Sequence, residues 1–183
     1  MGEIEQNKKR LLELFKKNAF HSRAVILSSG KKSDYYIDAK QVSLTPEGLF
    51  LIGKVVLDML KNDEFDAIGG LTIGADPIVA AIGVVSYLNA RPVQTFIVRK
   101  EPKQHGMQKF IEGPSLKPNS KVVIIEDVIT SGNSALKAIK AVETLKCRVV
   151  KVAALVDRLE GARESLSSQN YKLVSVFTKD NLK

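Results

Sequence analysis

Two adjacent acids, Glu126 and Asp127, stand between an apolar run and a stretch of small polar residues. The apolar run, 122–125, consists of β-branched residues, which predicts a buried strand. A segment with helical spacing, 135–146, follows the small polar residues. The predicted order is therefore strand, acid pair, polar loop and helix.

This order suits the binding of a sugar phosphate. A polar loop at a helix start presents backbone N–H groups, and the helix dipole adds partial positive charge that favours a phosphate. Gly132 permits close backbone approach or a positive φ. Carboxylates accept hydrogen bonds, so the acids suit sugar hydroxyls or a metal ion. The pattern matches a site for ribose 5-phosphate, and a solvated turn is the alternative.

The whole segment 122–134 resembles the phosphoribosyl pyrophosphate (PRPP) binding motif of type I phosphoribosyltransferases. The resemblance implies that the acid pair holds the ribose hydroxyls, directly or through a metal, and that the loop fixes the 5-phosphate. It makes the following residues candidate PRPP ligands: Glu126, Asp127, Val128, Ile129, Thr130, Ser131, Gly132, Asn133 and Ser134.

A second glycine-rich turn lies in residues 69–83. We expect a strand, a turn and a helix there, with Asp76 as N-cap and Pro77 at the first helical position. The backbone N–H groups of 72–75 could hold a pyrophosphate, although any tight turn uses glycine. The segment resembles the pyrophosphate loop of the same fold, which makes candidate PRPP ligands of Thr72, Ile73 and Gly74. Many bacterial members carry lysine at position 74, so contacts here are expected from the backbone.

The stretch 99–113 is rich in cations and follows an expected strand at 93–98. Charge alone favours a solvated basic loop. The order Arg-Lys-x-x-Lys-x-His-Gly resembles, however, the flexible loop of orotate phosphoribosyltransferases that closes over PRPP, often across a dimer interface. The resemblance implies that Arg99 and Lys100 hold the diphosphate, and that Lys103 and His105 meet the leaving group.

A tyrosine pair, Tyr35 and Tyr36, follows a turn rich in serine and lysine. Spacing alone favours a β-hairpin with half-buried tyrosines. The segment resembles the N-terminal hood of orotate phosphoribosyltransferases, which implies that the pair lies beside the orotate ring. Many relatives carry a PRPP-binding lysine where this chain has Ser28, so this chain is expected either to manage without it or to use Lys31 or Lys32.

Arg158 follows an expected strand at 149–156. A salt bridge is the simple explanation of such a residue. In the family that the chain resembles, the arginine of Asp-Arg-x-Glu-Gly recognises the orotate carboxylate, and a planar guanidinium matches a carboxylate bidentately. The resemblance also implies that Thr130 lies near orotate.

The elements that position these residues alternate between strand and helix, which predicts an α/β fold with a doubly wound, mostly parallel sheet flanked by helices. An amphipathic helix is expected at 3–18. Thr45 and Pro46 form the N-cap and first turn of a helix that runs to about residue 60. Further strands are expected at 67–71 and 172–178, and a short helix at 162–168. The resemblance implies the type I phosphoribosyltransferase fold as one domain over 1–183, with a hood of about 1–44 and a core of about 45–183.

Composition is that of a globular domain, with 183 residues, 44% hydrophobic and 26% charged. The sequence contains neither an 18-residue apolar run nor an apolar signal core, so no membrane partner is expected. The single cysteine, Cys147, excludes an internal disulfide and fits a cytoplasmic protein. A Cys/His cluster for zinc is also missing from the sequence.

Taken together, the motifs imply an orotate phosphoribosyltransferase that joins N1 of orotate to the ribose of PRPP in pyrimidine synthesis, with orotidine 5′-monophosphate and pyrophosphate as products. The implied catalytic residues are Lys103, His105, Glu126 and Asp127. The implied cofactor is Mg²⁺, bound mainly through PRPP, with Glu126 and Asp127 as candidate ligands. A homodimer that shares the 99–112 loop across its interface is expected, without a nucleic-acid partner.

Two alternatives stay open at this point. One is a phosphoribosyltransferase for a purine base, which would share 122–134 but lack the hood and Arg158. The other is a PRPP-sensing regulator that binds RNA or DNA, because the formal charge of +8 suits an anionic partner. Nucleic-acid binding of that kind would depend steeply on salt.

Overall fold

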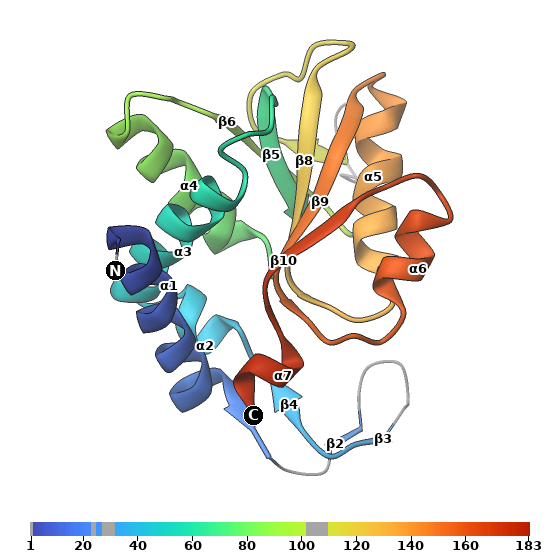
Figure 1. The fold of residues 1–183 in the computed structure, drawn as a ribbon. Coiled ribbons are helices and arrows are strands. Elements are labelled where there is room, and N and C mark those ends of the chain that lie inside the picture. Colours follow the sequence, from blue (N-terminus) through green and yellow to red (C-terminus); the bar gives the residue numbers. More distant parts are fainter. Residues whose placement is uncertain (1, 23–24, 27–31, 102–109) are drawn as a thin grey trace.

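The computed structural model describes residues 2–22, 25–26, 32–101 and 110–183, and a central sheet organises them (Figure 1). The sheet has six strands in the order β10-β9-β8-β5-β6-β7, and every neighbouring pair is parallel except β6 and β7. The strands are β5 (Ala67–Leu71), β6 (Gln94–Val98), β7 (Ile111–Glu112), β8 (Lys121–Ile129), β9 (Arg148–Asp157) and β10 (Leu173–Thr178). The mostly parallel sheet that the sequence predicts is confirmed.

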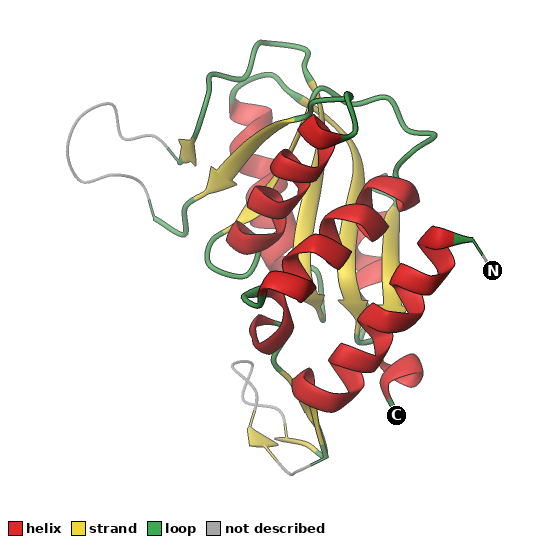
Figure 2. Ribbon diagram, turned by 90° about the vertical axis from the view of Figure 1, so that its left-hand side faces the viewer, coloured by secondary structure: helices red, strands yellow, loops and turns green. Residues whose placement is uncertain are grey.

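Helices cover both faces of the sheet, as the two views in Figures 1 and 2 show. One face carries α1 (Glu3–Leu14), α3 (Pro46–Met59) and α4 (Asp76–Leu88), and the other carries α5 (Asn133–Thr144) and α6 (Ala162–Ser167). Side chains alternate along β8, as they do in any strand. Val123 and Ile125 pack with the first set of helices, whereas Val122 and Ile124 pack with the second.

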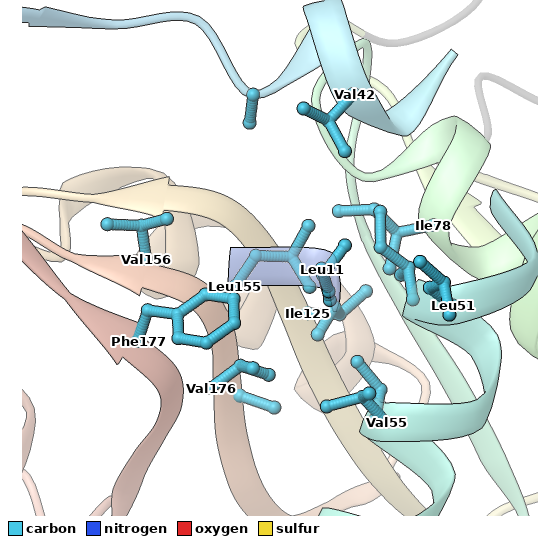
Figure 3. Packing of buried hydrophobic residues seen from close by; sticks show 14 of the residues in the cluster. Leu11, Val42, Leu51, Val55, Ile78, Ile125, Leu155, Val156, Val176 and Phe177 are labelled. Atoms are coloured by element: carbon cyan, nitrogen blue, oxygen red, sulfur yellow. The ribbon is translucent and has the colours of Figure 1, made fainter. Parts of the chain in front are cut away.

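The N-terminal segment packs into the same core as the sheet. Figure 3 shows Leu11 of α1 among side chains of α3 and of the central strands. A π-helical turn, η1 (Phe15–Ala19), continues α1, and the Phe15 ring lies 5.9 Å from that of Phe177 on β10. Leu11 and Phe15 are both fully buried, so the amphipathic helix expected near the N-terminus is confirmed.

Short elements form a hood at the end of the molecule where β5, β8 and β9 end (Figure 1). Two antiparallel pairs, β1 with β4 and β2 with β3, connect to the helix α2. The bounds are β1 (Phe20–His21), β2 (Val25–Ile26), β3 (Lys32–Ser33), β4 (Tyr36–Ile37) and α2 (Lys40–Ser43). The C-terminal helix α7 (Lys179–Leu182) is followed by Lys183, whose carbonyl accepts from Nζ of Lys16 in η1 at 3.0 Å.

Several boundaries differ from the sequence prediction. The strand expected at 122–125 extends to Ile129, because its ladder with β9 continues to the pair of Ile129 and Asp157. Asp76 is the first residue of α4 rather than its N-cap, which is Ala75. Sequence periodicity did not predict α2, α7 or the edge strand β7, which are too short to show a period. Thr45 caps α3 as expected, its hydroxyl accepting from the Gly48 N–H at 3.1 Å.

No helix in the described ranges has the length and hydropathy needed to cross a membrane.

Candidate active site

The candidate site lies where the order of parallel strands reverses. From β5 the chain passes through α4 to β6, and from β8 through α5 to β9, so the two connections leave on opposite sides. Open α/β sheets bind ligands at this position, outside the carboxyl ends of the strands. The ladder between β5 and β8 pairs Ala67–Gly69 with residues 122–124, so the later residues of β8 extend beyond it.

A cleft of about 330 Å³ opens at this point. It brings together the acid pair, the turn after β5 and one residue of the basic stretch, all distant in sequence. Its lining residues are Lys40, Leu71, Thr72, Ile73, Gly74, Lys100, Glu126, Asp127, Val128 and Ser134. Of these described residues, all but Lys40 and Leu71 are sequence-predicted PRPP ligands.

Glu126 is a buried acid inside β8, with 6% of its surface exposed. Its Oε1 atom is buried and has no hydrogen-bond partner among the described residues. Burial, and to a lesser extent the neighbouring charge of Asp127, raises the pKa of Glu126 to about 8. In the ligand-free protein, burial therefore favours the protonated form of this side chain, and its unpartnered Oε1 could meet a ligand hydroxyl or, after loss of the proton, a cation.

Asp127 lies directly against the turn that follows β5. Burial raises the pKa of Asp127, while the Val128 N–H, which donates to Oδ1 at 2.7 Å, and the charge of Lys40 act in the opposite direction. A Cβ atom on Gly74 would stand 2.5 Å from Oδ1 of Asp127. Side chains at position 74 are therefore excluded unless Asp127 moves, which explains why this turn can offer only backbone atoms there.

Fewer backbone donors are open in the 72–75 turn than the sequence suggests. The Thr72 N–H donates to the Val98 carbonyl at 2.8 Å, and the Ala75 N–H donates to the Leu71 carbonyl at 3.3 Å. The amides of Ile73 and Gly74 are the remaining candidates for an anion. The Thr72 hydroxyl donates to Oδ2 of Asp76 at 2.7 Å and so ties the turn to the start of α4.

The loop after β8 has the geometry of an anion site. Gly132 has φ +84° and is the N-cap of α5, which explains the glycine at this point. The first N–H groups of a helix have no partner inside it. Ser131, Asn133 and Ser134 are exposed, and Thr130 is half-buried. By contrast, the Ile129 side chain is 2% exposed and belongs to the core, so a role in PRPP binding cannot come from that side chain.

A second cluster surrounds Arg158 at the end of β9. The Arg158 guanidinium stacks on the Tyr35 ring, 4.5 Å from its centre, and its Nη2 donates to Oγ of Ser33 at 3.1 Å. Its Nε donates to Oε1 of Glu160 at 2.9 Å and to the Tyr35 hydroxyl at 3.2 Å. The Arg158 backbone N–H donates to the carbonyl of Ile129, so the cluster adjoins the 130–134 loop. Arg158 and Tyr35 thus meet, as the sequence predicts for an orotate site.

Ser33 and Glu160 are contacts of Arg158 that sequence reasoning did not assign. Glu160 stands two residues after Arg158, and this spacing is a signal that could have suggested the pair. Tyr36, in contrast, lies outside this cluster in the described structure and pairs with His21 across β1 and β4. Tyr35 precedes β4 and Tyr36 begins it, and the tyrosine pair divides between two environments.

The basic stretch is only partly placed. Lys100 lines the cleft, whereas the side chain of Arg99 binds Oε1 of Glu112 at 3.3 Å and the Glu101 carbonyl at 3.2 Å. The structure therefore does not bring Arg99 into the cleft. The candidates Lys31, Lys103 and His105 lie outside the described residues, as do the side chain of Lys32 and position 28, where many relatives carry lysine.

The acid pair fits a magnesium ion of the kind that is bound together with a substrate. Within the described residues, no group of three or more His, Cys, Asp or Glu side chains could hold a metal. Mg²⁺ is commonly held by one or two carboxylates, with substrate phosphates and waters completing its shell. Glu126 and Asp127 can supply those two, and the unpartnered Oε1 of Glu126 is one such oxygen.

Comparison with known proteins agrees with this geometry. The phosphoribosyl transferase domain family matches residues 45–178. Orotate phosphoribosyltransferase from Aquifex aeolicus is 50% identical over 151 residues, which covers 82% of each chain. The protein of the same name from Nostoc is 43% identical and covers 97% of this chain and 85% of its own.

Solved structures give the same result. Orotate phosphoribosyltransferase from Mycobacterium tuberculosis in complex with Fe(III) dicitrate superposes with a TM-score of 0.84 at 38% identity, over 96% of this chain and 98% of that one. The PRPP complex of the M. tuberculosis enzyme has a TM-score of 0.80 at 34% identity. Adenine phosphoribosyltransferase from Leishmania tarentolae, at 22% identity, shares the fold alone. The chain belongs to the orotate phosphoribosyltransferase family.

Proposed function

We propose that this chain transfers ribose 5-phosphate from PRPP to N1 of orotate, with orotidine 5′-monophosphate and pyrophosphate as products. One observation carries the proposal: the strand ends place the acid-lined cleft, the start of α5 and the Arg158–Tyr35 cluster side by side. The acid-lined cleft suits the ribose hydroxyls of a ribose phosphate, the start of α5 suits its phosphate, and the Arg158–Tyr35 cluster suits a planar base that carries a carboxylate.

In this proposal, PRPP occupies the cleft and the loop after it. The 5-phosphate lies at the 130–134 loop, where N-terminal amides of α5 and exposed hydroxyls donate to it. Glu126 and Asp127 accept hydrogen bonds from the ribose hydroxyls. The diphosphate lies toward Lys100 and the free amides of the 72–75 turn.

Orotate lies beside the Arg158 cluster. The bonds to Ser33, Tyr35 and Glu160 fix the plane of the guanidinium, which is then oriented before the base arrives. A carboxylate ligand would compete with Glu160 for the same cation, so binding of orotate requires Glu160 to yield part of its contact. In this proposal, Thr130, which follows Ile129 at the end of β8, lies between the two substrates.

The chemistry is largely electrostatic. The bond from ribose C1 to diphosphate breaks, the bond from C1 to N1 of orotate forms, and N1 loses its proton. Positive charge develops at C1 while negative charge develops on the leaving oxygens, and Lys100 is a described cation placed to stabilise the latter. Mg²⁺, when bound, would neutralise the diphosphate further.

Lys103 and His105 complete the proposal, on sequence resemblance alone, as groups that meet the leaving diphosphate. Lys103→Ala is expected to lower kcat by about 100-fold or more while PRPP still binds. An unchanged kcat would remove the assignment of the 99–112 loop.

A homodimer is part of the same proposal, and it is supported by an apolar stripe on α4. Val84, Tyr87 and Leu88 are 63%, 75% and 71% exposed, and their spacing places them on one side of the helix. A second copy of the chain would cover them and let the 99–112 loop reach across the interface. Light scattering should give the mass of two chains for the wild type and of one chain for Tyr87→Glu. A wild-type mass of one chain would contradict the dimer.

The deciding assay supplies PRPP, Mg²⁺ and one base. Orotate should lose absorbance, whereas adenine, hypoxanthine and guanine should give no product. Turnover of a purine would favour the first alternative function. Failure with every base, combined with salt-sensitive binding of RNA or DNA, would favour the regulator.

A cytoplasmic location also stays a proposal, consistent with one buried, free cysteine.

A further inference from the structure

Lys40 is a cation in the cleft that neither the sequence motifs nor the family resemblance assigns. It is the first residue of α2 and lines the cleft with Glu126, Asp127 and the 72–74 turn. The sequence reading missed it because four helical residues give no periodic signal. Among the described residues, Lys40 and Lys100 are the two cations that line this cleft.

The surroundings of Lys40 hold its charge in place. Its Nζ lies 3.0 Å from Oδ1 of Asp38, which also accepts from the Lys40 backbone N–H at 3.2 Å. The hydrogen bond to Asp38 is the main cause that raises the pKa of Lys40. Burial acts in the opposite direction, and the charge of Asp127 raises this pKa further. Lys40 therefore stays charged and lies within electrostatic reach of the acid pair.

Among the described residues, the 72–74 turn supplies no cation to the cleft, and Lys100 is the one lining cation of the basic stretch. A side chain at position 74 would begin within 2.5 Å of Asp127, so this turn cannot add a positive group without displacing the acid. The Arg99 side chain binds Glu112 instead. A polyanion that enters beside the acid pair needs positive partners, and the hood supplies one through Lys40.

We infer that Lys40 is a substrate-binding residue that contacts the diphosphate of PRPP and holds it beside the 72–74 turn. The inference rests on the proposed function, since it takes PRPP as the ligand. Lys40 exchanges its contact with Asp38, in part or fully, for phosphate oxygens. The lysine side chain is 40% exposed, so it can reorient without opening the core.

The test compares Lys40→Met and Lys40→Arg with a control at Lys61. Lys61 forms a similar pair, 3.1 Å from Oδ1 of Asp58, and lies outside the cleft. Lys40→Met should weaken PRPP binding by about 10- to 100-fold, the usual value of a hydrogen bond to a charged group. Lys40→Arg should restore most of the affinity, and Lys61→Met should leave it unchanged.

Two measurements separate this inference from the proposed function. In the first, PRPP and Mg²⁺ are titrated into the protein in a calorimeter without a base, so that the measured affinity for PRPP reports the contribution of Lys40 directly. In steady-state assays, Lys40→Met should raise KM for PRPP. Its KM for orotate should stay within about twofold of the wild-type value. Equal PRPP affinity in wild type and Lys40→Met would overturn the inference, as would equal loss of affinity for both substrates.

A wild-type protein that binds PRPP but does not consume orotate would refute the proposed function, while the titration still decides the role of Lys40. Absence of PRPP binding to the wild type would refute both. Thermal unfolding of each variant serves as the folding control, because Lys40 is on a short surface helix and its replacement should leave the unfolding temperature within about 2 °C.

Discussion

At the scale of single residues, the site depends on polar groups that are buried before any substrate arrives. Glu126 and Arg158 are 6% and 3% exposed, which is unusual for charged residue types. Arg158 is compensated by three side-chain partners, whereas one oxygen of Glu126 has none in the described structure. The partners of Arg158 orient its guanidinium for a ligand, whereas the unpartnered Oε1 of Glu126 is available to accept a hydrogen bond from one.

Replacement of Arg158 by alanine tests the base site. Arg158→Ala removes the guanidinium that would meet the orotate carboxylate, so KM for orotate should rise by about 100-fold or more, with KM for PRPP changed much less. Arg163→Ala is a control, because Arg163 binds Asp157 near the same strand end through an exposed side chain. Equal increases in both KM values would remove the carboxylate role of Arg158.

The buried Glu126 makes a prediction about pH. Its pKa in the folded protein is about 8, above the ordinary value of 4.5, so the folded state binds the proton more tightly than the unfolded chain does. The contribution to stability is then fully present below about pH 4.5 and is lost as pH rises through 8.

Glu126→Gln should remove this loss. Between pH 5 and 8.5 the free energy of unfolding of the ligand-free wild type should fall relative to that of Glu126→Gln by at least about 1 kcal/mol, the value of roughly one pKa unit. Urea denaturation at the two pH values measures the difference. Parallel pH dependence of the two proteins would show that Glu126 is ionised in the folded state.

At the scale of elements, the site is made by the ends of strands. The turn after β5 packs on Asp127 of β8, and the loop after β8 begins α5 at a glycine with positive φ. Both loops emerge from buried parallel strands, so the core fixes their starting points. The hood contributes from the other side through Tyr35 and Lys40.

The close contact of Gly74 with Asp127 predicts the effect of one methyl group. Gly74→Ala would place Cβ 2.5 Å from Oδ1 of Asp127, so either the turn or the carboxylate must shift. We expect kcat/KM for PRPP to fall by about tenfold or more, since displacements of about 1 Å in such sites have effects of this order or larger. Gly83→Ala in α4, with its nearest contact at 3.3 Å, should retain activity; similar activity in both variants would contradict the steric argument.

At the scale of the whole molecule, we propose that the hood and the core, about 1–44 and 45–183, fold as one cooperative unit. The reason is that α1 and η1 share a single hydrophobic cluster with α3, β8, β9 and β10 (Figure 3). Removal of α1 would expose the apolar face of α3 and part of the sheet.

Leu11→Ala tests this cooperativity. Leu11 is fully buried, so its truncation should lower the free energy of unfolding by about 2–5 kcal/mol. Leu145→Ala, at a residue that is 40% exposed, should change it by less than about 1 kcal/mol. Circular dichroism and tyrosine fluorescence should report one coincident transition. Two separate transitions would show that the hood unfolds on its own.

Much of the fold and of the site could be predicted from the sequence because the signals are local. The β-branched run of β8, the Thr45 cap and the strand–helix alternation are properties of neighbouring residues, and the structure confirms each of them. The PRPP motif and the Asp-Arg-x-Glu-Gly segment are also continuous in the chain. Predictions for Lys103 and His105 stay predictions, because those residues lie outside the described part of the structure.

By itself, the sequence determined the family, the sheet and the residue types that meet at its edge. The tertiary structure alone decided which of those residues share the cleft. It placed Lys40 beside Asp127, directed Arg99 to Glu112, and gave Arg158 the contacts with Ser33 and Glu160. The physical reason is that burial, electrostatic fields and steric exclusion depend on distances between segments far apart in the chain, which local sequence patterns do not contain.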